Sequence, residues 1–173
     1  MDEEVLRKLG MQQIIIDESV RYLIYARKLS EENHSLFYSH TSTAFYRVSI
    51  INWCIVFGSR NEDLHWSKVQ PHFGERAFSL RHILDDCNIE FDDWATYHER
   101  IRFLRDQFLA HFDINSLSTL VPSFDILLQT SVSYRNWIIH QIEYLQNSQL
   151  IINRRFFDTE DLIADIEHTF NSK

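Results

Sequence analysis

The chain has 173 residues and a formal charge of −8, from 17 lysines and arginines against 25 aspartates and glutamates. Its hydrophobic fraction of 45% excludes a disordered chain, and its length predicts a single domain over residues 1–173. The acidic balance argues against a general nucleic-acid coating protein, because such binding needs a broad basic face. A local basic pocket remains compatible with the sequence, because Arg100, Arg102 and Arg105 lie within one short segment.

Glycine and proline are scarce, with three glycines and two prolines in the whole chain. A β-sandwich or barrel needs many more turn residues, so this scarcity predicts a few long helices. Apolar residues recur at helical spacing over residues 3–32 and 36–57, and Gly58 follows the second segment where a C-terminal cap belongs. Residues 58–75 predict a long connection with a short helical turn around Trp66.

The second half of the chain predicts four more helices. They are expected over about residues 76–87, 92–112, 122–149 and 159–170, with Asp92 or Asp93 near the start of the second, Pro122 opening the third and Asp158 capping the last. Residues 150–157 are left open and are compatible with an extended segment. The expected fold is an all-α, single-domain antiparallel helical bundle of five to six helices.

The cysteines and the N-terminal segment indicate the compartment. Cys54 and Cys87 lie in apolar surroundings without a CxxC spacing, which predicts buried, reduced thiols. The first ten residues, MDEEVLRKLG, are acidic and lack the layout of a signal peptide. No apolar run approaches the roughly 20 residues that span a bilayer. We therefore expect a cytoplasmic protein with no membrane segment.

The sequence lacks the motifs of the common metal-binding, phosphate-binding and hydrolase sites. Nine histidines are present, but no HExxH or comparable ligand spacing occurs, so the sequence predicts no metal and no cofactor. Glycine-rich phosphate loops and a GxSxG elbow are also absent. Residues 52–66 are dense in aromatics, which predicts a helix end buried by Trp53 and Phe57 with Trp66 closing over it. A partner surface or the lip of a pocket remains the alternative.

The stretch at residues 105–113 reads RDQFLAHFD and combines an arginine with a histidine. In RNA cleavage a histidine moves the proton of the 2′-hydroxyl, while an arginine grips the phosphate. Asp106 or Asp113 would orient Arg105 or His111. On a straight helix Arg105 and His111 lie about 120° apart, so they converge only if the helix ends or bends, or if two copies meet across a two-fold axis.

A competing pair occurs at residues 135–140, which read RNWIIH. Arg135 and Asn136 precede His140 there, but the helical pattern continues past the histidine. A polar loop and then a long helix follow His111 instead, which favours the earlier pair. We expect Arg135 and His140 to be exposed or flanking positions that face a partner.

The RDQFLAHFD segment resembles the Arg-polar-x(3–5)-His signature of the HEPN superfamily of helical nucleotide-binding domains. The preceding run, INWCIVFGSRNEDLHW, is similar to the HEPN branch of bacterial abortive-infection systems, and the resemblance covers roughly Ala44 to Leu128. It implies a bundle of four to six helices, often dimeric, with metal-independent endoribonuclease activity in its active members. By position, Arg105 would bind phosphate, Asp106 would take the polar place and His111 would be catalytic.

The resemblance leads to two expectations about function. The first is a homodimeric endoribonuclease of a defence or toxin–antitoxin system, with RNA as substrate and an antitoxin or another defence protein as partner. The second is a catalytically inactive HEPN bundle that binds protein or nucleotide. Asn commonly follows the signature arginine in this superfamily, whereas Asp106 places a negative charge there. The third possibility is a helical bundle that is unrelated to the HEPN superfamily.

Overall fold

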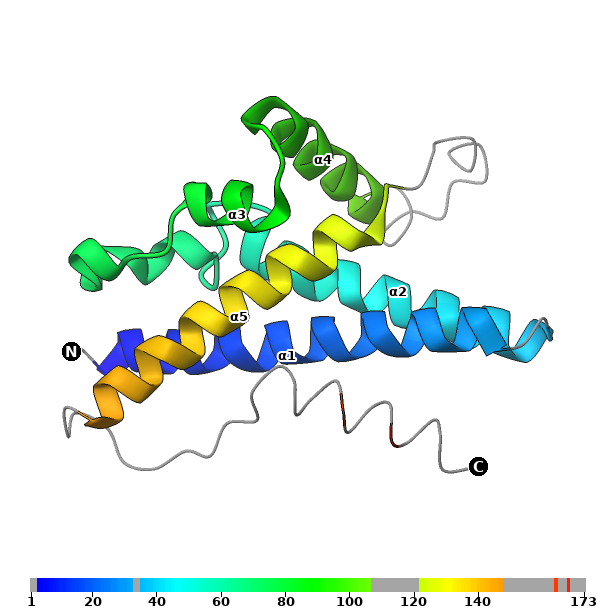
Figure 1. Cartoon of the computed structure of the whole chain (residues 1–173), viewed down its shortest axis with the longest axis horizontal. Coiled ribbons are helices and arrows are strands. Elements are labelled where there is room, and N and C mark those ends of the chain that lie inside the picture. Colours follow the sequence, from blue (N-terminus) through cyan, green and yellow to red (C-terminus); the bar gives the residue numbers. More distant parts are fainter. Residues whose placement is uncertain (1–2, 33–34, 107–121, 148–163, 165–167, 169–173) are drawn as a thin grey trace.

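The computed structural model describes residues 3–32, 35–106 and 122–147, together with Ala164 and His168, and these residues form an all-α helical bundle (Figure 1). The α-helices are α1 (Glu3–Glu32), α2 (Leu36–Phe57), α3 (Leu80–Cys87), α4 (Phe91–Leu104) and α5 (Phe124–Asn147). Three short 3₁₀ helices connect α2 to α3: η1 (Trp66–Lys68), η2 (Gln70–His72) and η3 (Gly74–Arg76). Within the described residues, no helix combines the length and apolar character needed to cross a membrane.

The first two helices form a long antiparallel hairpin, and their bounds agree with the sequence prediction. Ser19 and Ser49 are buried opposite one another, and each hydroxyl donates to the other residue's carbonyl oxygen, at 3.1 and 3.2 Å. Such small side chains let two helix backbones approach closely while their polar atoms stay satisfied. The hairpin continues past the first turn of α5, and exposed Leu36 and Phe37 lie at its far end (Figure 1).

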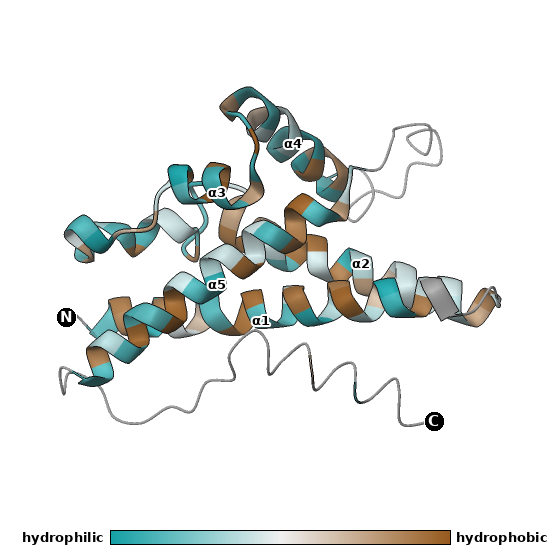
Figure 2. Ribbon diagram, in the orientation of Figure 1, coloured by the Kyte–Doolittle hydropathy of each residue, from teal (hydrophilic) through white to brown (hydrophobic). Residues whose placement is uncertain are grey.

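Helix α5 runs antiparallel to α1 and covers the hairpin. Asp125 in its first turn accepts a hydrogen bond from Arg27, and nine residues later Tyr134 donates a hydrogen bond of 2.9 Å to Gln12. Apolar residues alternate with polar ones along each helix, so that each contributes one side to the interior (Figure 2). Trp53 of α2 lies fully buried at the centre, and its indole N–H donates to the Thr130 hydroxyl at 2.8 Å.

Several predicted boundaries shift for identifiable reasons. Helix α3 starts at Leu80 rather than near residue 76, because Ala77 is extended and Ser79 forms a reciprocal capping box with His82. Helix α5 starts at Phe124 rather than at Pro122. The hydroxyl of Ser123 accepts the Asp125 backbone N–H there, as an N-cap does.

Helix α4 begins at Phe91, one residue before the predicted start, with Glu90 in the N-cap position. Its α-helical part ends at Leu104, and residues 107–112 of the helix predicted over about 92–112 lie outside the described residues. Its buried residues, Trp94, Tyr97 and Ile101, follow the expected spacing. The predicted last helix at 159–170 lies outside the described residues, apart from the helical Ala164 and His168.

The aromatic segment at the end of α2 is core, as predicted. Trp53 and Phe57 are buried, with ring centroids 5.1 Å apart. Trp66 does not close over them but packs edge-on against Phe78 at 5.8 Å. Cys54 and Cys87 are free and buried, which confirms the predicted thiols.

Candidate functional site

The predicted site begins where α4 ends. Arg105 directly follows Leu104, and its backbone N–H closes the helix on the carbonyl groups of Ile101 and Arg102. The backbone widens into a π-helical turn at Arg105 and Asp106. Such turns interrupt the α-helical register and occur frequently at functional positions.

Arg105 and Asp106, two of the three predicted site residues, form an ion pair. The guanidinium Nε and Nη2 atoms of Arg105 donate to one oxygen of Asp106, at 2.8 and 2.7 Å. The side chains are 26% and 55% exposed, so the pair reaches solvent at the helix end. The hydrogen bond that Arg105 donates to Asp106 raises the pKa of Arg105, and the guanidinium stays charged throughout the physiological range. His111 and Asp113 lie outside the described residues.

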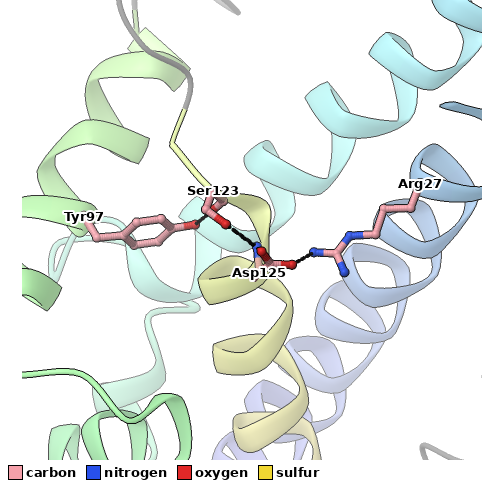
Figure 3. Close-up of polar contacts among 4 residues, drawn as sticks. All are labelled: Arg27, Tyr97, Ser123 and Asp125. Carbon is pink, nitrogen blue, oxygen red and sulfur yellow. Dashed lines mark hydrogen bonds and ion pairs between the residues drawn. The ribbon is translucent and has the colours of Figure 1, made fainter. Parts of the chain in front are cut away.

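A chain of polar contacts fixes the start of α5 against α4 and α1 (Figure 3). The Tyr97 hydroxyl of α4 donates to the Ser123 carbonyl at 2.9 Å, and the Ser123 hydroxyl donates to Asp125 at 2.8 Å. Asp125 in turn accepts from Arg27 of α1 at 2.5 Å. Because Ser123 precedes α5 and Tyr97 lies two turns before Arg105, these contacts tie the two described borders of residues 107–121 to one framework.

His98 anchors α4 to the end of α2. Its Nε2–H donates to the carbonyl oxygen of Phe57 at 2.6 Å, and its ring lies against Trp53 and Trp94. Phe57 is the last residue of α2, so its carbonyl is one of those that no intrahelical N–H satisfies. Burial lowers the pKa of His98, while the hydrogen bond to Phe57 acts in the opposite direction.

The buried Cys54 thiol of α2 lies within electrostatic range of charged side chains at the end of α4. Burial raises the pKa of the Cys54 thiol to about 12, while the guanidinium groups of Arg105 and Arg102 act to lower it. Both arginines are thus within electrostatic range of the same buried atom on α2. Arg47 lies seven residues before Cys54, on the same face of α2.

His65 lies in the connection between α2 and α3, within electrostatic range of His98. It is buried and caps η1, where its Nδ1 accepts the Ser67 N–H at 3.2 Å. Burial lowers the pKa of His65 to about 4, and the nearby Arg60, His98 and Lys68 add to that effect. His65 is therefore neutral at physiological pH and serves as a cap.

The competing pair at residues 135–140 was expected to be exposed, and for Arg135 that expectation is wrong. Arg135 is 1% exposed and forms an ion pair with Asp17 of α1, with Nε and Oδ1 2.5 Å apart. Its position on α5 faces α1, where the carboxylate of Asp17 accepts from its guanidinium. His140 is exposed, as predicted, and so is Asn136. Arg135 thus belongs to the interior of the bundle.

The sequence missed His98 as a member of the site and did not connect Arg102 with Arg105 by geometry. The signal was present, because residues 98, 102 and 105 follow the spacing of one helix face. Nothing in the sequence marked Phe57 as the acceptor for His98. Among the described residues, no three His, Cys, Asp or Glu side chains gather closely enough to hold a metal ion.

Comparisons with known proteins give no assignment. No family model, curated protein or solved structure matches the chain significantly. The site must therefore be interpreted from its own residues.

Proposed function

We propose that the chain is a metal-independent endoribonuclease of a bacterial defence or toxin–antitoxin system that acts as a homodimer. The observation that carries the proposal is the solvent-reaching guanidinium of Arg105 at the end of α4, beside Arg102, in a chain of net charge −8. An acidic protein that concentrates guanidinium groups at one helix end has a local surface suited to phosphate.

The proposed reaction uses the 2′-hydroxyl of RNA as nucleophile. His111 takes the proton from this hydroxyl, and the 2′ oxygen attacks the adjacent phosphorus. The bond from phosphorus to the 5′ oxygen then breaks, and the leaving oxygen takes a proton from water. Arg105 holds the phosphate and stabilises the charge that develops on its oxygens. The products are a 2′,3′-cyclic phosphate and a 5′-hydroxyl end, and no metal ion takes part.

Two-fold pairing is part of the proposal because of where α4 ends. The π-helical turn at Arg105 and Asp106 interrupts the α-helical register in which Arg105 and His111 would lie about 120° apart. A second copy that pairs through this helix end would bring two arginines and two histidines to one cleft. The site is then complete in the dimer, and the monomer is expected to be inactive.

The test is cleavage of total RNA in EDTA by the wild-type protein and by the Arg105→Ala and His111→Ala variants. Both variants are expected to lose activity by roughly 100-fold or more, as when a catalytic proton-transfer group is removed. Arg100→Ala and His140→Ala are the matched controls, because both residues are exposed on described helices and outside the proposed site. A DNA copy of the substrate lacks the nucleophile and should stay intact. Unchanged cleavage by Arg105→Ala and His111→Ala would refute the assignment.

The ion pair between Arg105 and Asp106 favours a second candidate, a catalytically inactive HEPN bundle that binds protein or nucleotide. A carboxylate already occupies the guanidinium, and a phosphate must displace it. Asp106→Asn removes this competition while keeping an amide oxygen beside Arg105. In a nuclease, the change should raise RNA affinity by roughly three- to tenfold and raise cleavage at low RNA concentration. If neither wild type nor Asp106→Asn cleaves RNA, the inactive bundle is the better description.

A further inference from the structure

One face of the α1–α2 hairpin, called the hairpin face below, exposes apolar side chains. Met11 and Ile14 of α1 are 44% and 51% exposed, and Val48 of α2 is 37% exposed. The Asn52 side chain of α2 donates to Glu18 of α1 at 3.2 Å, so the two helices meet on this side. Met11 and Ile14 lie seven and four residues before Glu18, and Val48 lies four residues before Asn52. The three apolar side chains therefore share the hairpin face.

Cationic side chains border the hairpin face along α1. Arg7, Ile14, Arg21 and Lys28 are spaced seven residues apart and fall within about 60° of one another on the helix. Among the described residues, none of these three cations forms an ion pair. Arg21 acts electrostatically on Asp17, but that carboxylate already binds a buried guanidinium. Exposed apolar groups beside unneutralised positive charge favour an acidic, amphipathic occupant.

A hollow lies at the end of the hairpin face near the start of α1. It has a volume of about 420 Å³ and is lined by Glu4, Arg7, Lys8, Met11, Asp63 and Leu64. Because Met11 belongs both to the hollow and to the hairpin face, the two are continuous. The hollow therefore offers room for a large apolar side chain of the segment that covers this face.

The chain that follows α5 starts beside this end of α1. Helix α5 is antiparallel to α1, so its last residue, Asn147, lies near the first turns of α1 (Figure 1). Residues 148–158 can extend over roughly 36 Å, at about 3.3 Å for each residue. The rise from Arg7 to Lys28 along α1 is only about 32 Å. The segment after residue 158 can therefore reach any part of the hairpin face.

The helix predicted over residues 159–170 has the complementary pattern. Its apolar residues are Leu162, Ile163, Ile166 and Phe170, which helical spacing places on one face. The two described residues of this segment, Ala164 and His168, are helical and exposed, and each is about 160° from Ile166. The exposed positions thus lie opposite the apolar ones.

The acidic residues of the same segment match the charge of α1. Four of them flank the apolar positions on the helical wheel: Glu160, Asp161, Asp165 and Glu167. A helix of twelve residues is only marginally stable by itself in water, so it requires a surface on which to bury its apolar side. The hairpin face supplies that surface together with the opposite charge.

We propose that residues 159–170 pack as an amphipathic helix on the hairpin face of the same chain. Their apolar side contacts Met11 and Ile14, and their acidic residues lie near Arg7 and Arg21. This closure removes from solvent an apolar patch that otherwise promotes association with other proteins. It is independent of the proposed nuclease activity, because neither Arg105 nor RNA takes part.

Met11 provides a probe within the hairpin face, because the chain has only one other methionine, Met1. The full chain is labelled with ¹³C at its methionine methyl groups, and the Met11 signal is followed by NMR. Ile166→Glu places a charge in the proposed contact and is expected to shift this signal. In the same variant, the backbone amides of residues 159–170 should exchange with solvent roughly tenfold faster, because the segment is no longer held against α1.

The matched control is Ala164→Glu, which adds the same side chain to the exposed side of the same segment. It is expected to leave the Met11 signal in place and to change amide exchange by less than about twofold, since glutamate is also a good helix former.

A second variant tests the charges from the side of α1. Arg7→Glu combined with Arg21→Glu should speed amide exchange over residues 159–170 by roughly three- to tenfold at low salt and by less at high salt. Arg100→Glu reverses an exposed charge on α4 instead and should have no such effect.

Three outcomes would overturn the proposal. The first is an identical Met11 signal and identical exchange in wild type, Ile166→Glu and Ala164→Glu. The second is faster exchange in Ile166→Glu with an unchanged Met11 signal, because the segment would then pack elsewhere. The third is a Met11 shift that depends on protein concentration, because a second copy would then cover the hairpin face.

Discussion

Two arginine–aspartate pairs in this chain have similar sequence contexts and opposite environments. Arg135 opens one Arg…His pattern and is paired with Asp17 inside the bundle, where it is 1% exposed. Arg105 opens the other and is paired with its own neighbour, Asp106, at the solvent-reaching end of α4. The first pair joins α5 to α1 across 118 residues of sequence, while the second joins adjacent residues.

This difference indicates which arginine is available to a ligand. Removing one member of a buried pair leaves an uncompensated charge, so Arg135 is committed to the fold. An exposed pair contributes little to stability and exchanges readily with solvent ions. The same residue type in the same short pattern therefore serves stability in one place and is available for recognition in the other.

The largest expected effect on stability appears when Arg135 and Arg105 are each replaced by glutamine in separate variants. Arg135→Gln should lower the free energy of unfolding by about 3–5 kcal/mol, because Asp17 then lacks its partner within the bundle. Burial already raises the pKa of Asp17 despite Arg135, so the carboxylate depends strongly on that guanidinium. Arg105→Gln should change the free energy of unfolding by less than about 1 kcal/mol. Urea unfolding followed by circular dichroism gives both values.

A double variant sharpens this result. Asp17→Asn combined with Arg135→Gln removes both charges and should recover part of the stability that Arg135→Gln alone loses. Equal stability losses in Arg135→Gln and Arg105→Gln would mean that the two environments do not differ as described.

Acidification is expected to produce the next largest effect, through the buried His65 in the connection between α2 and α3. The pKa of His65 is lowered to about 4, so between about pH 6.5 and pH 4 the unfolded chain binds more protons than the folded chain. Stability is therefore full above about pH 6.5 and falls by up to roughly 3 kcal/mol as the pH approaches 4. His98, whose pKa is also lowered, adds a loss of the same sign. Asp17, whose pKa is raised, acts in the opposite direction.

The measurement is the urea midpoint as a function of pH. His65→Asn keeps a side-chain acceptor for the Ser67 N–H but does not titrate, so its midpoint should fall less on acidification. His140→Asn changes an exposed histidine of α5 and should follow the wild-type curve. Parallel curves for wild type and His65→Asn would show that His65 does not control the acid response.

The smallest effect is expected at a third pair, Arg27 with Asp125, which resembles the Arg105 pair in exposure. Arg27→Gln should reduce the free energy of unfolding by about 0.5 kcal/mol at low salt and by less at high salt, where the charges are screened. The comparison of urea midpoints in low and high salt tests this. A loss close to that of Arg135→Gln would place this pair with the buried one instead.

Local patterns in the sequence predicted the long elements well. The apolar spacing of residues 3–32 and 36–57, together with Gly58, was sufficient for α1 and α2, because helix periodicity and caps are properties of neighbouring residues. The start of α3 was not predictable in this way. The Phe78 backbone N–H donates to the side chain of Gln70 at 2.5 Å, and Ala77, which precedes it, is extended, so the chain leaves η3 before α3 begins.

The candidate site was predictable only in part. Arg105 and Asp106 could be chosen from their pattern, and the structure brings them together. The burial of Arg135 depends on Asp17, and the place of His98 depends on the carbonyl of Phe57, so both require knowledge of which helices meet. His111 lies outside the described residues, and its role remains part of the proposal.

The length of the α1–α2 hairpin has a consequence for how the molecule opens locally. Past Arg27, where α5 begins, the described part of the hairpin consists of two helices supporting one another, and it ends near exposed Leu36 and Phe37. Amide hydrogens there should exchange with solvent through local fraying, at a small fraction of the global unfolding free energy. Those near buried Ile16 should exchange only when the whole bundle opens. A protease is therefore expected to make its first cut in this hairpin near its tip and to leave the region around Arg105 folded.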